Sequence, residues 1–265
     1  MLRKLIAGVT LLTAICHAQT RGSYLGFDKN DYPGDELLAA LHKTFAYTGY
    51  WLNNPPGMTS NPWTGKRARV RSAGFGFLIL FNGRLDDQLK GQDAGALGTA
   101  DAETAVQAAR REGFSPHAII FLDQEEGGRL LPEQAAYLGA WFADIAKAGM
   151  RAGIYCSGIE VPDGESNIST AKDVAVRFPE VKLWIVNDQC PPAPGCVSNA
   201  DSPANGGVKD ALVWQYALSP RSQIAASCKA GYAADKSCYA PGLPQSSKTQ
   251  IDMNTSNTRD PSAGR

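Results

Sequence analysis

The chain has 265 residues with 26 basic and 26 acidic side chains, so its formal net charge is zero. A neutral chain has no basic field to attract nucleic acid, and we exclude DNA and RNA as partners. This length fits one large α/β domain or two small ones. The chain lacks the run of ~20 apolar residues that a membrane span needs, so stable membrane insertion is not expected.

The first 18 residues have the pattern of a secretory signal peptide. Arg3 and Lys4 give a positive start, residues 5–15 form a short apolar segment, and small residues precede a cleavage point after Ala18. We therefore expect a mature chain, residues 19–265, that folds as one domain. The expected location is secreted or periplasmic.

Eight short apolar runs, rich in β-branched and aromatic residues, predict strands. They are residues 24–28, 45–52, 75–81, 118–123, 152–157, 182–188, 211–217 and 250–254. Most of these runs are continuously apolar and do not alternate with polar residues. This pattern is typical of parallel strands that are covered on both sides.

Helical patterns fill the intervals between the strand-like runs. The clearest is residues 131–149, with an apolar face at spacings of three and four, Pro132 in its first turn and Gly149 at its end. Further helices are expected at residues 33–44, 64–73, 99–112 and 169–178. Eight strands alternating with helices predict a parallel α/β sheet, and favour a (β/α)8 TIM-type barrel over an open doubly wound sheet.

The late part of the chain differs from this pattern. Residues 189–210 and 219–249 are rich in Pro, Gly, Ser and Cys, and predict long loops that replace or decorate the last helices. In an exported protein, short spacing favours the disulfides Cys190–Cys196 and Cys228–Cys238, with Cys156 as a buried free thiol. The cysteines match no zinc pattern with the three distant histidines, so we expect no metal and no cofactor.

Carboxylates recur at the ends of the predicted strands. Asp28 follows the first strand, Asp123 and Glu125 follow the fourth, and Asp252 lies in the last. Residues two apart on a strand point to the same side, which places Asp123 and Glu125 ~6.6 Å apart along the backbone. Paired carboxylates at a barrel mouth suit glycoside hydrolysis, with one acid protonated and the other charged. The alternative is that such acids cap helices or form ion pairs. We expect Glu126 to be a solvated neighbour of the pair, and Asp188 to be a loop residue.

Aromatic residues near the strand ends are candidates for stacking on sugar rings, although aromatic residues also dominate protein cores. Tyr50 and Trp51 both close the second strand. The candidate substrate-binding set is Asp28, Asp252, Tyr50, Tyr155, Trp184, Trp214 and Tyr216.

Six short motifs occur in the order seen in a known group of enzymes. They are "GFD" (26–28), "FLDQE" (121–125), "GMRAGIYCSG" (149–158), "LWIVND" (183–188), "LVWQYA" (212–217) and "IDMN" (251–254). In this order the chain resembles the glycoside hydrolase family 25 lysozymes. It resembles still more closely the related glycoside-hydrolase-like domain family, the Rv2525c-like group. The resemblance implies a barrel, with Glu125 at the position of the general acid and Asp123 at that of the acid two residues before it. It also implies that Asp28 and Asp252 flank the cleft.

We therefore expect a monomeric, secreted glycosidase of the muramidase type that hydrolyses β-linked amino-sugar polymers such as peptidoglycan. Glu125 is expected in a dry, enclosed environment that raises its pKa, with Asp123 held in the ionised form by hydrogen bonds. A non-catalytic carbohydrate- or cell-wall-binding barrel is the alternative. A metal-dependent hydrolase or deacetylase is disfavoured because the sequence has no cluster of nitrogen ligands.

Overall fold

The computed structural model describes residues 22–199, 201–221, 228 and 230–265, so the expected signal peptide lies outside the described residues. Eight strands close a barrel in the order β1-β10-β9-β8-β5-β4-β3-β2, which confirms the predicted fold class. The strands are β1 (Tyr24–Asp28), β2 (Tyr47–Trp51), β3 (Gly76–Asn82), β4 (Ile119–Asp123), β5 (Arg151–Ser157), β8 (Lys182–Val186), β9 (Val213–Ala217) and β10 (Asp252–Ser256). Each one overlaps a predicted run.

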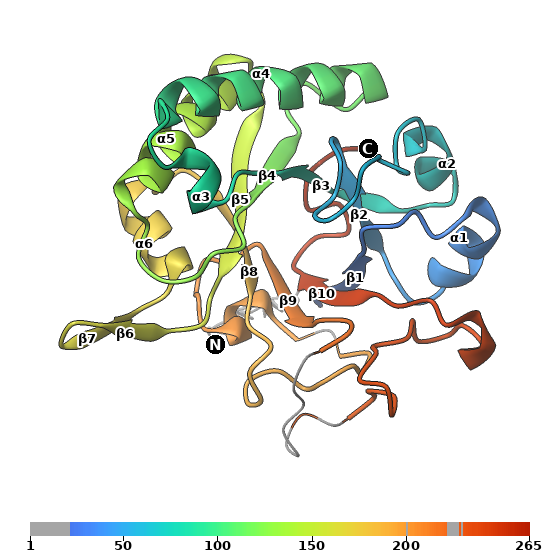
Figure 1. Ribbon diagram of the computed structural model, residues 1–265. Coiled ribbons are helices and arrows are strands. Elements are labelled where there is room, and N and C mark those ends of the chain that lie inside the picture. The colour runs from blue at the N-terminus through green and yellow to red at the C-terminus, as the bar shows by residue number, and fades with distance from the viewer. Residues whose placement is uncertain (1–21, 200, 222–227, 229) are drawn as a thin grey trace, which may run out of the picture.

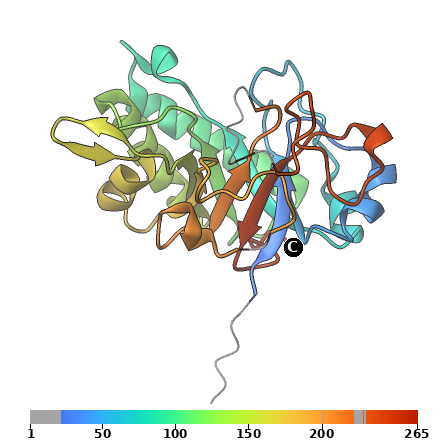
Figure 2. The ribbon, with the colours of Figure 1, turned by 90° about the horizontal axis from the view of Figure 1, so that it is seen from below.

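The barrel departs from the expected all-parallel sheet at its last strand. β10 runs antiparallel to both of its neighbours, β1 and β9, whereas the other neighbouring strands of the barrel are parallel. Figure 2 shows β10 lying beside β1. Because of this reversal, the first residue of β10 lies at the same end of the barrel as the last residues of the parallel strands.

Six helices cover the barrel between the early strands. They are α1 (Asp35–Leu41), α2 (Arg67–Ser72), α3 (Asp86–Leu89), α4 (Ala94–Glu112), α5 (Pro132–Lys147) and α6 (Thr170–Arg177). The Asp93 side chain caps α4 by accepting a hydrogen bond from Ala96 N at 3.0 Å, and Gly113 ends it with a φ of 80°. α4 packs tightly on α5, since a Cβ at Gly98 would lie 2.2 Å from the Tyr137 carbonyl oxygen.

The two connections that follow β8 and β9 are long loops, as predicted. Short helical turns described in these loops include Pro203–Gly206 and Gln245–Ser247. In Figure 1, α3 to α6 lie on one side of the barrel, α1 and α2 on another, and these late loops below. One hairpin, β6 (Val161–Asp163) with β7 (Ser166–Ile168), was not expected from the sequence and projects from the body.

The segment after β10 lies between the starts of β3 and β4. Ser262 donates its backbone N–H to the Phe77 carbonyl and accepts one from Ile119 N, which places it between the starts of β3 and β4. Its hydroxyl accepts from Ile79 N at 2.8 Å. This segment supplies partners to strand groups that the barrel itself leaves open. No helix among the described residues has the length and apolar character needed to cross a membrane.

Candidate active site

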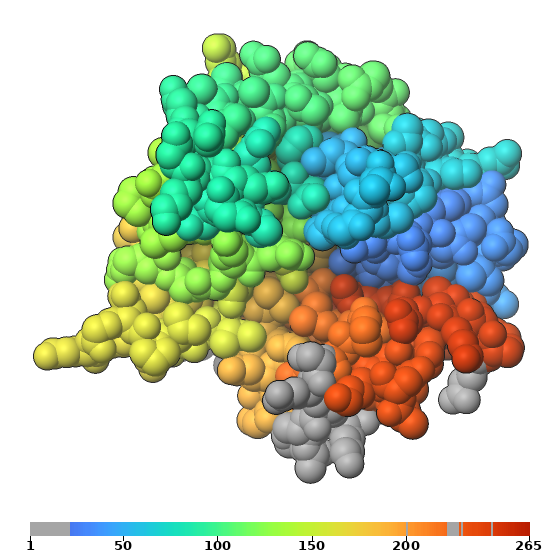
Figure 3. All heavy atoms as spheres, in the orientation of Figure 1, coloured from blue at the N-terminus to red at the C-terminus, as the bar shows by residue number. Residues whose placement is uncertain are grey.

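A small cavity of about 140 Å³ opens at the end of the barrel where the parallel strands finish. Its lining includes all four of the carboxylates singled out in the sequence: Asp28, Asp123, Glu125 and Asp252. In the space-filling view the face toward the viewer is hollowed near its centre, between green, blue and orange segments (Figure 3). The strands therefore bring together acids that are more than 220 residues apart in the chain.

The register of the strands explains this convergence. Asp28 is the last residue of β1 and Asp252 is the first of β10, and the two are direct partners in the antiparallel pair. Asp123 ends β4, beside Tyr155 of β5. Asp28 also needs space, which Gly49 of β2 provides, because a Cβ at Gly49 would lie 2.7 Å from the Asp28 Cβ.

Two amide side chains hold Asp28 in place. Its Oδ1 accepts hydrogen bonds from Gln215 Nε2 at 2.8 Å and Asn254 Nδ2 at 2.7 Å. The Trp184 indole, which can only donate, bonds to Asn254 Oδ1 at 2.9 Å and so fixes the direction of that amide. In the same way, the Tyr155 hydroxyl donates to Gln215 Oε1 at 2.6 Å. Sequence reasoning missed both amides, although each occupies an inward position on its strand.

The buried acids favour their protonated forms. Burial raises the pKa of Asp28 from 3.8 to about 6, against the opposing effect of the hydrogen bonds from Asn254 and Gln215. Burial and the nearby Asp28 carboxylate raise the pKa of Asp252 well above its usual value. For Asp123, burial is again the main cause of a raised pKa, followed by repulsion from Glu125 and Asp28. This end of the barrel therefore keeps protons on its buried acids at a pH where free carboxylic acids ionise.

The expected environments of Asp123 and Glu125 are wrong for this structure. Glu125 is exposed at the rim, whereas the sequence reasoning placed it in an enclosed environment. Asp123 is only 5% exposed, and its Oδ1 has no hydrogen-bond partner among the described residues, so this oxygen lacks the hydrogen bonds expected to favour the ionised form. The physical reason is the position of each residue: Asp123 is the last residue of the buried strand, and Glu125 lies two residues beyond it in the open loop.

Glu126 also differs from its expected role as a solvated neighbour. Its Oε2 accepts hydrogen bonds from Gln134 Nε2 at 2.6 Å and from the backbone N–H of Asp86 at 2.9 Å. These bonds tie the loop after β4 to α5 and α3, and so fix the backbone that carries Glu125. Asp188 forms an ion pair with Arg221 at 2.7 Å, as expected of a loop residue.

Some of the aromatic candidates point into the barrel and others point outward, because side chains alternate along each strand. Tyr155 and Trp184 line the cavity, and so does Trp51, which the candidate set omitted in favour of Tyr50. Side chains on a strand alternate between the barrel interior and its outer surface. Because Trp51 points inward, Tyr50 points outward, where its hydroxyl lies 2.6 Å from Glu112 Oε2.

Because of the same alternation, Trp214 and Tyr216 do not line the cavity. Gln215 between them is the inward residue of β9. The Trp214 indole donates to the Asn187 carbonyl at 2.8 Å, and the Tyr216 hydroxyl donates to the Val197 carbonyl at 2.9 Å. These two aromatic residues therefore anchor the loop after β8 on the outside of the barrel.

The disulfides differ from the expected local pairs. They join Cys190 to Cys228 and Cys196 to Cys238, whereas Cys156 is free and buried, as predicted. Each bond links the loop after β8 to the loop after β9. The expected pairing was wrong because nearness in sequence does not show that two different loops cross the same end of the barrel.

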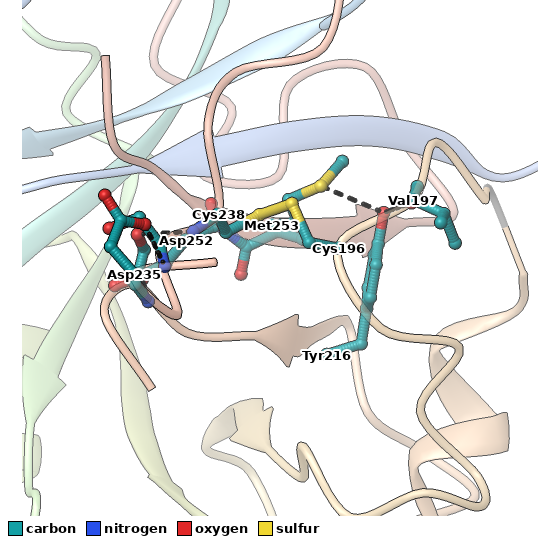
Figure 4. Close-up of a disulfide and its surroundings, with 10 residues drawn as sticks. Cys196, Val197, Tyr216, Asp235, Cys238, Asp252 and Met253 are labelled. Atoms are coloured by element: carbon teal, nitrogen blue, oxygen red, sulfur yellow. Dashed lines mark hydrogen bonds between the residues drawn. A yellow bond between two sulfur atoms is a disulfide. The ribbon is translucent and has the colours of Figure 1, made fainter. Parts of the chain in front are cut away.

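The second disulfide supports the candidate site directly. Cys238 N donates to the Ser219 hydroxyl at 2.8 Å, and Ser219 N donates to Asp252 Oδ1 at 2.6 Å. Figure 4 shows the Cys196–Cys238 bond beside Asp252 and Met253 of β10. The disulfide therefore fixes the loop that supplies a hydrogen bond to one of the four acids.

A family model for the Rv2525c-like, glycoside hydrolase-like domain matches residues 45–192, which is 148 of the 265 residues. The chain belongs to this family. The match covers Asp123 and Glu125, whereas Asp28 and Asp252 lie outside it and reach the site through the barrel topology. No curated protein matches the sequence.

Solved structures share the fold of this family member at low sequence identity. An uncharacterized B. stearothermophilus protein aligns with a TM-score of 0.59 and 20% identity, over 89% of this chain and 97% of its own. A muramidase from Trichobolus zukalii gives a TM-score of 0.52 and 13% identity, over 89% and 94%. The Mycobacterium tuberculosis Tat-secreted protein Rv2525c, in complex with L-tartrate, gives 0.50 and 13%, over 89% and 95%. These likenesses support the glycoside-hydrolase-like fold.

Proposed function

We propose that this protein is a glycoside hydrolase that cleaves β-linked amino-sugar polymers, with peptidoglycan as its substrate. One observation carries the proposal: four carboxyl groups from three separate strands and one loop line a single cavity together with three aromatic residues. Acidic pairs supply the proton transfer and the charge stabilisation of glycosidic cleavage. Trp51, Tyr155 and Trp184 supply surfaces suited to sugar rings. The similarity of the fold to that of a muramidase supports the proposed hydrolase function.

Asp123 and Glu125 share a proton in the proposed mechanism. In the free protein the proton resides on buried Asp123, because burial and the charge of Glu125 disfavour its ionised form. A sugar chain lying over the rim removes water from Glu125 and shifts the proton to that carboxyl group. Glu125 then donates it to the glycosidic oxygen as the bond from that oxygen to the sugar carbon breaks, and a water molecule adds to that carbon and returns a proton to the carboxylate.

Asp123 becomes charged as positive charge develops on the sugar. Asp123 lines the cavity, and its buried Oδ1 has no hydrogen-bond partner among the described residues, so ionisation breaks no hydrogen bond at this oxygen. An approaching positive charge favours the ionised carboxylate, so the interaction strengthens as the transition state forms. Asp28, held by its two amides, gives this end of the barrel a fixed third acid.

We also propose that the protein is exported. Two disulfides suit an oxidising compartment, and the first 18 residues have the composition of a signal peptide. The M. tuberculosis protein of similar fold is described as Tat-secreted. A monomeric state and a single domain over residues 19–265 stay predictions.

Release of reducing ends from purified peptidoglycan and chitin oligomers tests the proposed function. We expect turnover by the wild type, and a loss of ~10²-fold or more in Glu125→Gln with glycan affinity retained, because amide and acid have nearly the same shape. Glu180→Gln, at an exposed position between α6 and β8, is the matched control and should keep full activity. A wild type that binds glycan without turnover would support the binding-barrel alternative. Turnover untouched by Glu125→Gln would reject the assigned proton donor.

A further inference from the structure

A larger polar cavity of about 730 Å³ adjoins the acid-lined cavity. The two share Asn30 and Asp252 in their linings, so a chain of sugars placed over the acids extends into this second space. The acid-lined cavity has only about 140 Å³, so it has no room for the substituents of a branched sugar. The larger cavity is therefore the space beside the acids with room for such substituents.

One wall of the larger cavity is a rigid loop. The Lys29 carbonyl accepts a hydrogen bond from the Trp51 indole at 3.2 Å, and the Asn30 carbonyl accepts one from the Trp63 indole at 3.0 Å. Asn30 Nδ2 donates to the Pro56 carbonyl at 3.1 Å. Two indole hydrogen bonds fix the backbone of these consecutive residues, and the third ties the Asn30 side chain to the loop at Pro56. The Lys29 side chain is thus presented from a preorganised support, directly after Asp28.

The ammonium group of Lys29 is enclosed but weakly paired. The side chain is 15% exposed, and burial lowers its pKa. Two carboxylates face it: Asp31, whose side chain is 71% exposed and whose Oδ2 lies 3.8 Å from Nζ, and Asp252 in the same cavity. The 3.8 Å separation from Asp31 is too long for a hydrogen bond. The long ion pair with the exposed Asp31 carboxylate leaves donors of the ammonium group available to a ligand.

We propose that the larger cavity is a subsite for a carboxylate carried by the glycan, and that Lys29 binds it. This inference rests on the proposed function and narrows its substrate to glycans with acidic substituents, in contrast to neutral chitin. Charge-assisted hydrogen bonds from an ammonium group to a carboxylate are among the stronger polar contacts in proteins. Lys248, exposed on another part of the same lining, adds a second positive charge.

Equilibrium binding to three polymers tests the subsite, with Glu125→Gln as the background so that no polymer is consumed. The polymers are glycan strands with their stem peptides, the same strands with the peptides removed to leave the lactyl carboxylate, and chitin oligomers without a carboxylate. We expect Lys29→Met to weaken binding of carboxylate-bearing strands by about tenfold, the size of one lost charged hydrogen bond, and to leave chitin binding unchanged. Lys248→Met should give a smaller effect in the same direction. Lys43→Met, exposed and outside the cavity, is the control.

The two sources of the carboxylate give different results. If the lactyl group is bound, Lys29→Met weakens binding of both types of strand. If a peptide carboxylate is bound, only the strands that retain peptides are affected. Three results would overturn the subsite. They are an equal loss of chitin affinity in Lys29→Met, no loss of affinity for any polymer in that variant, and no binding of any polymer.

Turnover separates this inference from the proposed function. Lys29-dependent binding with no wild-type turnover would keep the subsite and reject the hydrolase. Turnover of all three polymers that is identical in Lys29→Met and the wild type would keep the hydrolase and reject the subsite.

Discussion

The buried carboxyl group of Asp28 makes the stability of the folded protein depend on pH. It is almost fully buried, and although two amides donate to its Oδ1, its pKa is raised to about 6. In the unfolded chain the same carboxyl group titrates near 3.8. Between these two values the folded state binds a proton that the unfolded state has lost. The free energy of unfolding therefore falls as the pH rises from about 4 to about 6, and this contribution stays absent at higher pH.

Asp28→Asn should reverse this loss. Asparagine carries no charge, and its Oδ1 can accept both amide hydrogen bonds. The variant should raise the free energy of unfolding by about 1–3 kcal/mol at pH 7.5. Each unit of difference between the pKa values of the folded and unfolded states corresponds to about 1.4 kcal/mol. At pH 4, where the wild-type group is protonated in the folded state, it should change little. Urea unfolding at the two pH values measures the difference. An equal change at both would show that the charge of Asp28 is not the cause.

At the scale of elements, runs rich in apolar, β-branched and aromatic residues predicted all eight barrel strands, although β10, with the sequence DMNTS, is largely polar. The direction of β10 could not be predicted in this way, since an apolar run reads the same for either direction. The hairpin β6–β7 was missed because it is short and mostly exposed. The sequence also did not show which side chains of each strand face the barrel interior, because parallel barrel strands are buried on both sides. For that reason the sequence did not show that Trp214 and Tyr216 lie outside the cavity, whereas the polarity of Asp28, Asp123 and Asp252 singled out residues that line it.

Two neighbouring residues of β2 test this assignment of faces. Tyr50→Phe removes a buried hydroxyl that contacts Glu112 and the Trp63 carbonyl, and should lower the free energy of unfolding by about 1–3 kcal/mol. Its glycan affinity should match that of the wild type. Trp51→Phe shrinks the aromatic surface of the cavity and should weaken glycan binding severalfold. Denaturant unfolding and glycan titration of both variants provide the comparison. Weaker binding in Tyr50→Phe alone would reverse the assigned faces.

At the scale of the whole molecule, the two disulfides take the place of the missing last helices. Both bonds cross between the same two loops, with sequence separations of 38 and 42 residues. Loops of this length lose about 4 kcal/mol of chain entropy in the unfolded state when they are closed, so each bond should contribute similarly to stability. Their effects on the site should differ, because only Cys238 is hydrogen-bonded to the Ser219 that donates to Asp252.

The paired variants Cys190→Ser/Cys228→Ser and Cys196→Ser/Cys238→Ser separate these contributions. We expect similar drops in the midpoint of thermal unfolding, and a larger loss of glycan turnover in the Cys196→Ser/Cys238→Ser protein. Peptide mapping of the non-reduced wild type should recover Cys190 with Cys228 and Cys196 with Cys238. Recovery of the local pairs, or equal turnover in the two variants, would remove the link between disulfide and site.

The central claim is that this barrel cleaves a glycosidic bond. Mass spectrometry of the soluble products that the wild-type protein releases from purified peptidoglycan tests this claim most directly. Glycosidic cleavage predicts disaccharide–peptide fragments that carry new reducing ends, gain two hydrogen atoms on borohydride treatment, and are absent from the Glu125→Gln digest. Free stem peptides, sugars that have lost acetyl groups, or fragments formed equally by Glu125→Gln would contradict it.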